Sequence, residues 1–201
     1  MSFWDKSNEA VNGKWQVLVS HLLLTVYHLF QMIKTERLTL IACKQEHFDA
    51  FERNENELAE MLDVELADGW LVFPEVISYS REFLKNNPDA ANWWMYFFIH
   101  SADRKLIGNG GFKGKPDDAG TVEIGYAVAP AYRGKGLATE AAQGLIDFAF
   151  SNAQIQTIQA HTLAEENESV KVLRKVGMEF VKEFNDPEDG DIRQWQLKRE
   201  V

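Results

Sequence analysis

Apolar and polar residues recur with two different periods along this chain of 201 residues, and the period predicts where helices and strands lie. Alternating or densely aromatic runs are typical of strands, and apolar residues three and four positions apart are typical of helices. The pattern predicts strands over 35–43, 93–100, 105–112, 121–128, 155–163, 178–185 and 191–198. It predicts one or two helices within 44–67, and further helices over 78–86, 136–152 and 165–176.

One face of the expected helix over 136–152 is apolar. The residues on this face are Leu137, Ala141, Leu145 and Phe148. Glu140 lies on another face and is expected to reach solvent. The helix over 78–86 is expected to begin at Ser78, where Glu82 stands near the position for a reciprocal cap.

The order of the elements predicts the fold class. Three closely spaced strands between residues 93 and 128 indicate an antiparallel meander. After them, a helix lies between two strands twice. We therefore expect an α/β (α+β) domain with a mixed, largely antiparallel central sheet and flanking helices. The glycines of the second strand, which indicate bulges or close backbone approach, are Gly108, Gly110 and Gly111.

The first residues form a separate unit in this prediction: a helical extension over 1–32, followed by one domain over 33–201. The stretch from Trp15 to Ile33 contains no Asp, Glu, Lys or Arg, and its apolar residues recur at helical steps. It is long enough to span a bilayer, but it is interrupted by polar residues and lacks the positive flank of a signal peptide. We expect the helix to pack on its own domain or on a partner in a homodimer, and not on a membrane. A membrane-surface helix and a membrane span stay open as alternatives.

Charge and cysteine content narrow the function classes. The formal net charge of −10 argues against a general nucleic-acid binder, which should be basic. The single cysteine, Cys43, lies in an apolar run and is expected in the core, so an internal disulfide and a thiolate metal cluster are both excluded. A reducing compartment fits this content, and we expect a cytoplasmic protein. The histidines His47, His100 and His161 show no metal-ligand spacing, so no metal is expected.

A glycine-containing turn carries the strongest chemical signal. The segment Arg133-Gly134-Lys135-Gly136-Leu137-Ala138 joins an expected strand to an expected helix. The first turn of a helix presents unpaired N–H groups and partial positive charge, and glycines allow a phosphate to approach these groups closely. The spacing does not fit a P-loop, and Thr139 occupies the place of the third glycine of a dinucleotide fingerprint. A tight turn without a ligand remains the alternative.

Two motifs resemble those of the GNAT superfamily of N-acetyltransferases. The first is Arg133-x-x-Gly136-x-Ala138 after a strand that ends in Ile124-Gly125-Tyr126-Ala127-Val128. The second is the late segment from Asn167 to Met178, which is similar to the helix that ends in Lys-x-Gly-Phe in that superfamily. The segment 33–40 also resembles the first strand of the branch that contains ribosomal-protein alanine acetyltransferases.

The resemblance implies acetyl-CoA as co-substrate and an amine as acceptor. The pyrophosphate would lie on the turn formed by Arg133, Gly134, Lys135, Gly136, Leu137 and Ala138. The pantetheine arm would pair with the backbone of Tyr126, Ala127 and Val128, and the N–H of Val128 would stabilise the negative charge that develops on the acetyl oxygen. Much of the acceleration would come from holding the amine beside the thioester.

The resemblance also implies candidates for proton transfer. Glu123 lies on the same strand and is a candidate general base acting through water, with a surface carboxylate or an ion-pair partner as the alternative. Relatives often carry a tyrosine in the late helix, but Leu173 stands at that position. Ser169 is the candidate substitute for proton donation to the thiolate, with a helix cap as the alternative. Asn167 is a candidate contact for pantetheine.

These residues favour an N-acetyltransferase that acts on a primary amine, either a protein N-terminus or a small molecule, by direct attack in a ternary complex. The alternative is a non-catalytic acyl-CoA-binding or regulatory module on the same fold. The residues do not decide between the two classes of acceptor.

Overall fold

A largely antiparallel sheet organises residues 32–187 and 189–200, which are the residues that the computed structural model describes. Its strands lie side by side in the order β1-β2-β4-β5-β6-β7-β9-β8, and β3 pairs with β5 outside this order. Their bounds are β1 Met32–Lys34, β2 Leu38–Ala42, β3 Glu65–Leu66, β4 Met95–His100, β5 Lys105–Phe112, β6 Thr121–Val128, β7 Thr157–Leu163, β8 Glu179–Asp186 and β9 Gly190–Lys198. The expected mixed sheet is confirmed.

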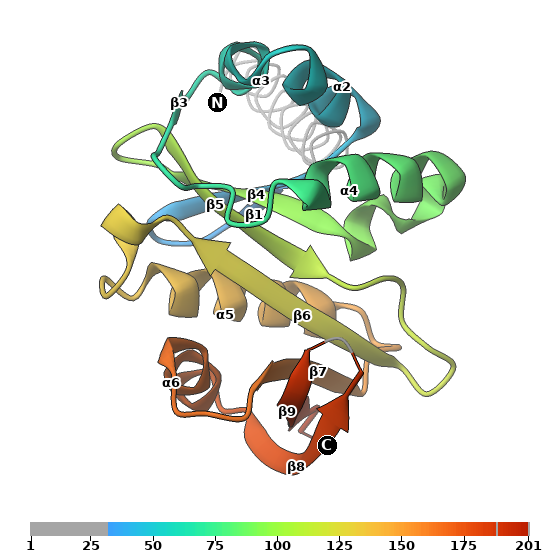
Figure 1. Ribbon diagram of the computed structural model, residues 1–201. Coiled ribbons are helices and arrows are strands. Elements are labelled where there is room, and N and C mark those ends of the chain that lie inside the picture. The colour runs from blue at the N-terminus through green and yellow to red at the C-terminus, as the bar shows by residue number, and fades with distance from the viewer. Residues whose placement is uncertain (1–31, 188, 201) are drawn as a thin grey trace, which may run out of the picture. The chain divides into compact units, whose positions relative to one another are not determined.

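Helices cover both faces of the first half of the sheet. Figure 1 shows α2, α3 and α4 gathered on one side of β4 and β5, and α5 on the other. The bounds are α2 Gln45–Arg53, α3 Glu55–Leu62, α4 Glu75–Asn86, α5 Leu137–Ser151 and α6 Glu168–Lys175, with short 3-10 turns at Pro88–Trp93 and Pro130–Tyr132. Among the described residues, no helix is both long and apolar enough to cross a membrane.

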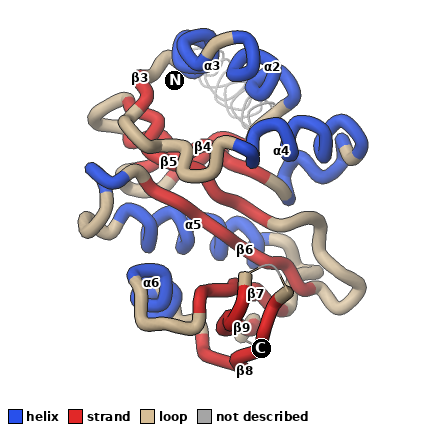
Figure 2. The backbone as a smooth tube through the Cα atoms, viewed as in Figure 1, coloured by secondary structure: helices blue, strands red, loops and turns tan. Residues whose placement is uncertain are grey.

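The two halves of the sheet separate where β6 meets β7. Neighbouring strands from β2 to β6 are antiparallel, whereas β6 and β7 are parallel and pair only from Thr121 to Glu123 on the β6 side. Beyond Glu123 the two strands diverge, and the long strand β6 continues to Val128 beside β5 alone (Figure 2). One edge of β6 is therefore left without a neighbouring strand over its last five residues.

The core fills both faces of the sheet, as the apolar pattern predicts. On the α5 face, Leu38 and Leu40 of β2 are buried, and Gly144 of α5 allows the helix to approach them closely. On the other face, Trp70 packs edge-on against Phe97 of β4. Cys43 is fully buried, so its expected place in the core is confirmed.

Glycines shape the middle of β5, as expected. A Cβ on Gly108 or Gly110 would lie within 2.4 Å of a β6 carbonyl oxygen, and one on Gly111 would lie 2.0 Å from the carbonyl oxygen of Trp94. A register shift between Phe98 and Ile99 of β4 faces this stretch of β5. Only glycine permits this close approach of three strands.

Two local expectations were wrong. The helix expected from Ser78 begins at Glu75 with Pro74 as its N-cap, so Ser78 caps nothing and its hydroxyl instead meets Glu52 of α2. The strand expected over 35–43 is the shorter β2, Leu38–Ala42, because a tight corner at Thr35, whose N–H donates to the carbonyl of Leu38, separates it from β1. The short strand β3 was not foreseen. The helical extension expected over 1–32 lies outside the described residues apart from Met32, which belongs to β1.

Candidate functional site

The glycine turn at the start of α5 has the geometry of an anion site. Gly134 and Gly136 have φ of 72° and 80°, a left-handed conformation that glycine adopts without strain. The first helical hydrogen bond runs from the N–H of Glu140 to the carbonyl of Gly136, so the N–H groups between these residues point out of the helix end. A Cβ on Gly134 would meet no atom within 4 Å. The turn is therefore open to a phosphate, and the residues present fit the pyrophosphate of acetyl-CoA.

Arg37, from the corner between β1 and β2, lies against this turn. Its Nη1 donates to the carbonyl of Lys135 at 3.0 Å, and its Nη2 lies 3.5 Å from the position of a Cβ on Gly136. Its Nε bonds to Glu140 at 2.6 Å, and Glu140 also accepts from the hydroxyl of Thr35. Arg37 therefore adds a guanidinium beside the turn and satisfies the carbonyl of Lys135.

Glu140 does not reach solvent as expected, because its side chain is 14% exposed and covered by the corner. Burial disfavours its charge, but the bonds from Thr35 and Arg37 outweigh this effect and lower the pKa of Glu140. The carboxylate is therefore ionised at neutral pH and fixes the guanidinium in place.

Replacing Arg37 with methionine is expected to weaken acetyl-CoA binding about 10-fold, because the turn loses the guanidinium that lies beside Gly136. The dissociation constant can be measured by calorimetry at two salt concentrations, and the variant should show the smaller salt dependence. Arg53→Met removes the same charge from an exposed ion pair on α2 and should leave binding unchanged. Glu140→Gln keeps the guanidinium but weakens its anchor, so an equal loss in that variant would show that position matters more than charge. Unaltered affinity in Arg37→Met would show that Arg37 does not contribute to binding acetyl-CoA.

The free edge of β6 lies next to this turn. The N–H of Lys113 donates to the carbonyl of Glu123, and the N–H of Ala129 donates to the carbonyl of Ile107, both toward the β5 side. Because backbone groups alternate in direction along a strand, those of Tyr126 and Val128 point to the opposite edge, where β7 has diverged. The carbonyl of Val128 accepts from Nε of Arg133 at 3.0 Å, which leaves its N–H directed into the gap.

Glu123 stands where β6 and β7 separate, in a group of polar side chains. Lys113 Nζ lies 2.5 Å and His161 Nδ1 lies 3.0 Å from its Oε1, and Gln159 Nε2 donates to its other oxygen at 3.3 Å. Burial disfavours ionisation of Glu123, but Lys113 and His161 outweigh it and lower the pKa of the carboxyl. Glu123 is therefore an ionised carboxylate that orients an imidazole, an arrangement suited to proton transfer.

Tyr126 and Ser169 are brought together across the divergence of the sheet. The Tyr126 hydroxyl lies 3.4 Å from the backbone carbonyl oxygen of Ser169 in the first turn of α6. Burial raises the pKa of Tyr126, so the phenol keeps its proton at neutral pH. The helix cap is Asn167 and not Ser169, because the Asn167 side chain accepts from the N–H of Val170 at 3.1 Å.

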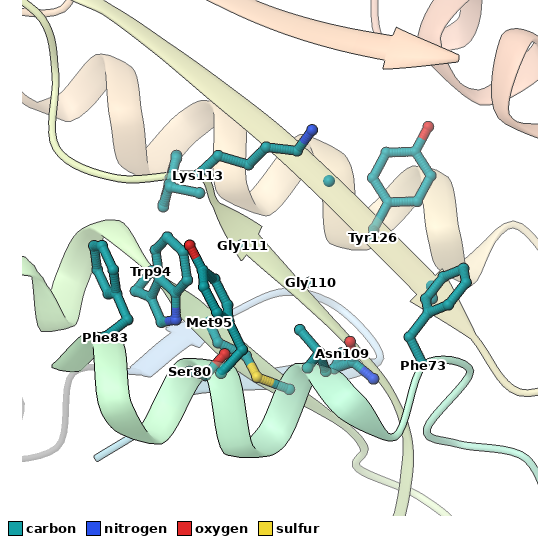
Figure 3. Close-up of a pocket in the computed structure, with 15 residues that line it drawn as sticks. Phe73, Ser80, Phe83, Trp94, Met95, Asn109, Gly110, Gly111, Lys113 and Tyr126 are labelled. Carbon is teal, nitrogen blue, oxygen red and sulfur yellow. The ribbon is translucent and has the colours of Figure 1, made fainter. Parts of the chain in front are cut away.

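A pocket of about 620 Å³ opens on the α4 face of β6. Figure 3 shows Phe83, Trp94 and Met95 along one wall, with Lys113 and Tyr126 across from them. The apolar side chains of the lining belong to Phe73, Val76, Tyr79, Phe83, Trp94, Met95 and Phe112. A Cβ on Gly125, which also lines the pocket, would meet no atom within 4 Å. Such a volume is typical of a small-molecule site.

Comparison with known proteins decides the family. The model of the GNAT acetyltransferase domain matches residues 37–179. The chain belongs to the GNAT acetyltransferase family. An uncharacterised N-acetyltransferase of Bacillus subtilis, YjdG, is 31% identical over 148 residues, which are 73% of this chain and 88% of that protein.

Solved structures share the fold of this GNAT protein. A GNAT-family acetyltransferase from Bacillus anthracis superposes with a TM-score of 0.58 at 24% identity, over 83% of this chain and 98% of that one. An acetyltransferase from Salmonella typhimurium that modifies the N-terminal serine of a ribosomal protein superposes with a TM-score of 0.62 at 15% identity, over 84% and 99% of the two chains. The chain is therefore an acetyl-CoA-dependent acyltransferase with the fold that its motifs implied.

Two residues of this candidate site were not predicted from the sequence, and a third was predicted only for its backbone. His161 had no metal-ligand spacing and was read as ordinary, Arg37 lies almost a hundred positions from the glycine turn, and the side chain of Tyr126 was passed over in favour of its backbone. Alternation along 157–163 does place His161 on the same face as Gln159, which is the one local signal available.

Proposed function

We propose that this protein transfers the acetyl group of acetyl-CoA to a primary amine by direct attack in a ternary complex. The observation that supports the proposal best is the free edge of β6, which begins at Glu123 and ends beside the glycine turn. The pyrophosphate binds the turn from Arg133 to Ala138, including Gly134, Lys135, Gly136 and Leu137, and Arg37 adds charge beside it. The pantetheine arm runs along Tyr126, Ala127 and Val128. The amine enters from the pocket under α4.

The reaction needs a nitrogen–carbon bond to form as the carbon–sulfur bond breaks. A protonated amine loses two protons in all, one before the attack and one as the amide forms, and the sulfur of CoA takes one up. In this proposal the Glu123–His161 pair receives the first proton, directly or through water, because His161 is held by an ionised carboxylate. The N–H of Val128, which points into the gap, stabilises the charge on the acetyl oxygen.

In the same proposal, the hydroxyl of Tyr126 supplies the proton that the sulfur of CoA takes up. Its pKa is raised by burial, so it is protonated when the thiolate forms. The Tyr126 hydroxyl donates to the backbone carbonyl of Ser169, and the side chain of Ser169 is the alternative donor. Asn167 already uses its side-chain oxygen as the cap of α6, and in this role it would hold the helix end that the pantetheine passes.

The acceptor classes named for structural relatives are proteins and small molecules. One neighbour, RimL, is described as an α-N-protein acetyltransferase of a ribosomal protein, and another is a chimera of spermidine N-acetyltransferases. Both are at most 16% identical to this chain, so they show a shared fold, and either acceptor class is compatible with it.

The test combines binding and turnover. We expect acetyl-CoA to bind in calorimetry, and we expect CoA thiol to be released when a primary amine is added to the full chain. A panel of peptides with free N-termini, polyamines and arylalkylamines covers the acceptor classes. Tight binding without thiol release from any amine would favour the non-catalytic module, and no binding would contradict both readings.

A further inference from the structure

The pocket under α4 carries few charges, although the protein as a whole is acidic. The chain has 31 Asp and Glu residues, yet none of those that the structure describes lines this pocket. Among the described lining residues, the one basic side chain is that of Lys113, which stands at the rim and is paired with Glu123. A site that selects a polycation would place carboxylates around it, because a buried or half-buried ammonium needs a partner.

Aromatic rings form the outer wall of the same pocket. Phe83 and Trp94 stack with their centroids 3.7 Å apart, and Tyr79 lies 5.9 Å from Trp94. The rings of Phe73 and Tyr79 are 60% and 63% exposed, which is unusual for large apolar side chains. Exposed aromatic rings beside a cavity are typical of a surface that a ligand covers.

The remaining polar groups of the wall do not make it polar toward a ligand. Ser80 Oγ and Trp94 Nε1 are both covered from solvent and have no hydrogen-bond partner among the described residues. The amide of Asn109 is engaged with the carbonyl of Trp70. The surface that an acceptor meets is therefore aromatic and aliphatic, and it ends at Gly125 and Ala127 of β6, next to the edge where the thioester would lie.

We infer that the acceptor is a small primary amine that carries one aromatic or large apolar group and no second cation. The inference rests on the proposed acetyl transfer and names its substrate class. The apolar group fills the pocket between α4 and β5, and the amino group reaches past Gly125 toward Glu123. A second positive charge on the acceptor would find no carboxylate partner among the described residues that line the pocket, so it is disfavoured there.

The inference can be tested with thiol release from a matched panel. 2-Phenylethylamine and tryptamine are expected to have kcat/KM values at least about 10-fold above those of spermidine and putrescine, since burying one ring is worth about one decade or more. Release with any amine supports the proposed reaction. A preference for the polyamines would then overturn the inference alone, whereas acetyl-CoA binding without release from any amine would overturn the reaction.

Tyr79→Ala provides the structural test, because this exposed ring can be removed with little effect on folding. The KM for 2-phenylethylamine is expected to rise about 10-fold, with kcat and the acetyl-CoA dissociation constant within about twofold of the parent. Phe180→Ala is the matched control, since that ring is 53% exposed and does not line the pocket. An unchanged KM in Tyr79→Ala together with an unchanged KM in Phe73→Ala would show that the acceptor does not occupy this pocket.

Discussion

Replacing Gly136 with glutamate should raise the dissociation constant for acetyl-CoA at least about 100-fold. Gly136 is the N-cap of α5 and has a φ of 80°, and a side chain here would project beside the guanidinium of Arg37. The new carboxylate would pair with Arg37 and occupy the place of the pyrophosphate, so charge and bulk both act against the ligand. Calorimetry with acetyl-CoA and CoA measures the loss.

Gly136→Ala is the matched variant for backbone strain. Both substitutions place an L-residue in the left-handed region, which costs about 1–2 kcal/mol, but alanine brings no charge and meets its nearest atom at an ordinary 3.5 Å. Thermal unfolding should therefore show similar stability for the two variants, while binding differs strongly between them. Retained affinity in a folded Gly136→Glu variant would contradict the pyrophosphate placement.

Glu123→Gln should lower kcat about 100-fold near neutral pH, within the range usual for loss of a general acid–base group. The carboxyl has a lowered pKa, so it is ionised throughout the range in which the protein can be assayed, and the loss should not arise from its own titration. Without this carboxylate, the reaction depends on amine that has already lost its proton in solution. The deficit should therefore shrink as the pH rises toward the pKa of the acceptor, near 10 for an alkylamine such as lysine. The measurement is a kcat/KM profile against pH for both proteins.

Tyr126→Phe is the comparison variant for the proton that the sulfur of CoA takes up. It removes one hydroxyl and leaves Glu123, His161 and Lys113 in place, so kcat should fall while the slope of the profile on the acidic side stays that of the parent. A Glu123→Gln profile that runs parallel to that of the parent at every pH would argue against proton transfer by the Glu123–His161 pair and leave Glu123 a structural role.

The regular strands and helices of the fold were predictable because the local pattern of apolar and polar residues determines them. The strands over 105–112 and 121–128 were predicted with the bounds that the structure shows, since alternation and turn residues enclose both. The start of α4 was not, because Ser78 and Glu82 imitate a cap, whereas the chain turns into the helix at Pro74 after an extended loop. A local cap motif does not indicate whether the preceding residues are already helical.

The cofactor turn could be located from sequence, but its surroundings could not. Glycines before an apolar helix mark a backbone site that needs no distant partner. Arg37 and Glu140 meet across 103 positions, and helical periodicity alone placed Glu140 in solvent. The Glu123–His161 contact likewise depends on the pairing of β6 with β7, which no local pattern specifies. Contacts between candidate catalytic groups on separate strands are therefore the part of a site that is hardest to predict from sequence.

Gly125 is a point in the pocket lining where a side chain can be added. Its backbone does not lie in the left-handed region, and a Cβ there meets no neighbour, so the position accepts an L-residue without strain in the sheet. In the proposed reaction, the pocket for the amine therefore extends to this point because position 125 has no side chain. Replacing Gly125 with Ala, Val and Leu in turn would shorten the pocket stepwise, and the cofactor turn would not be altered. Acceptor size can thus be tested at a single position where a Cβ meets no neighbour.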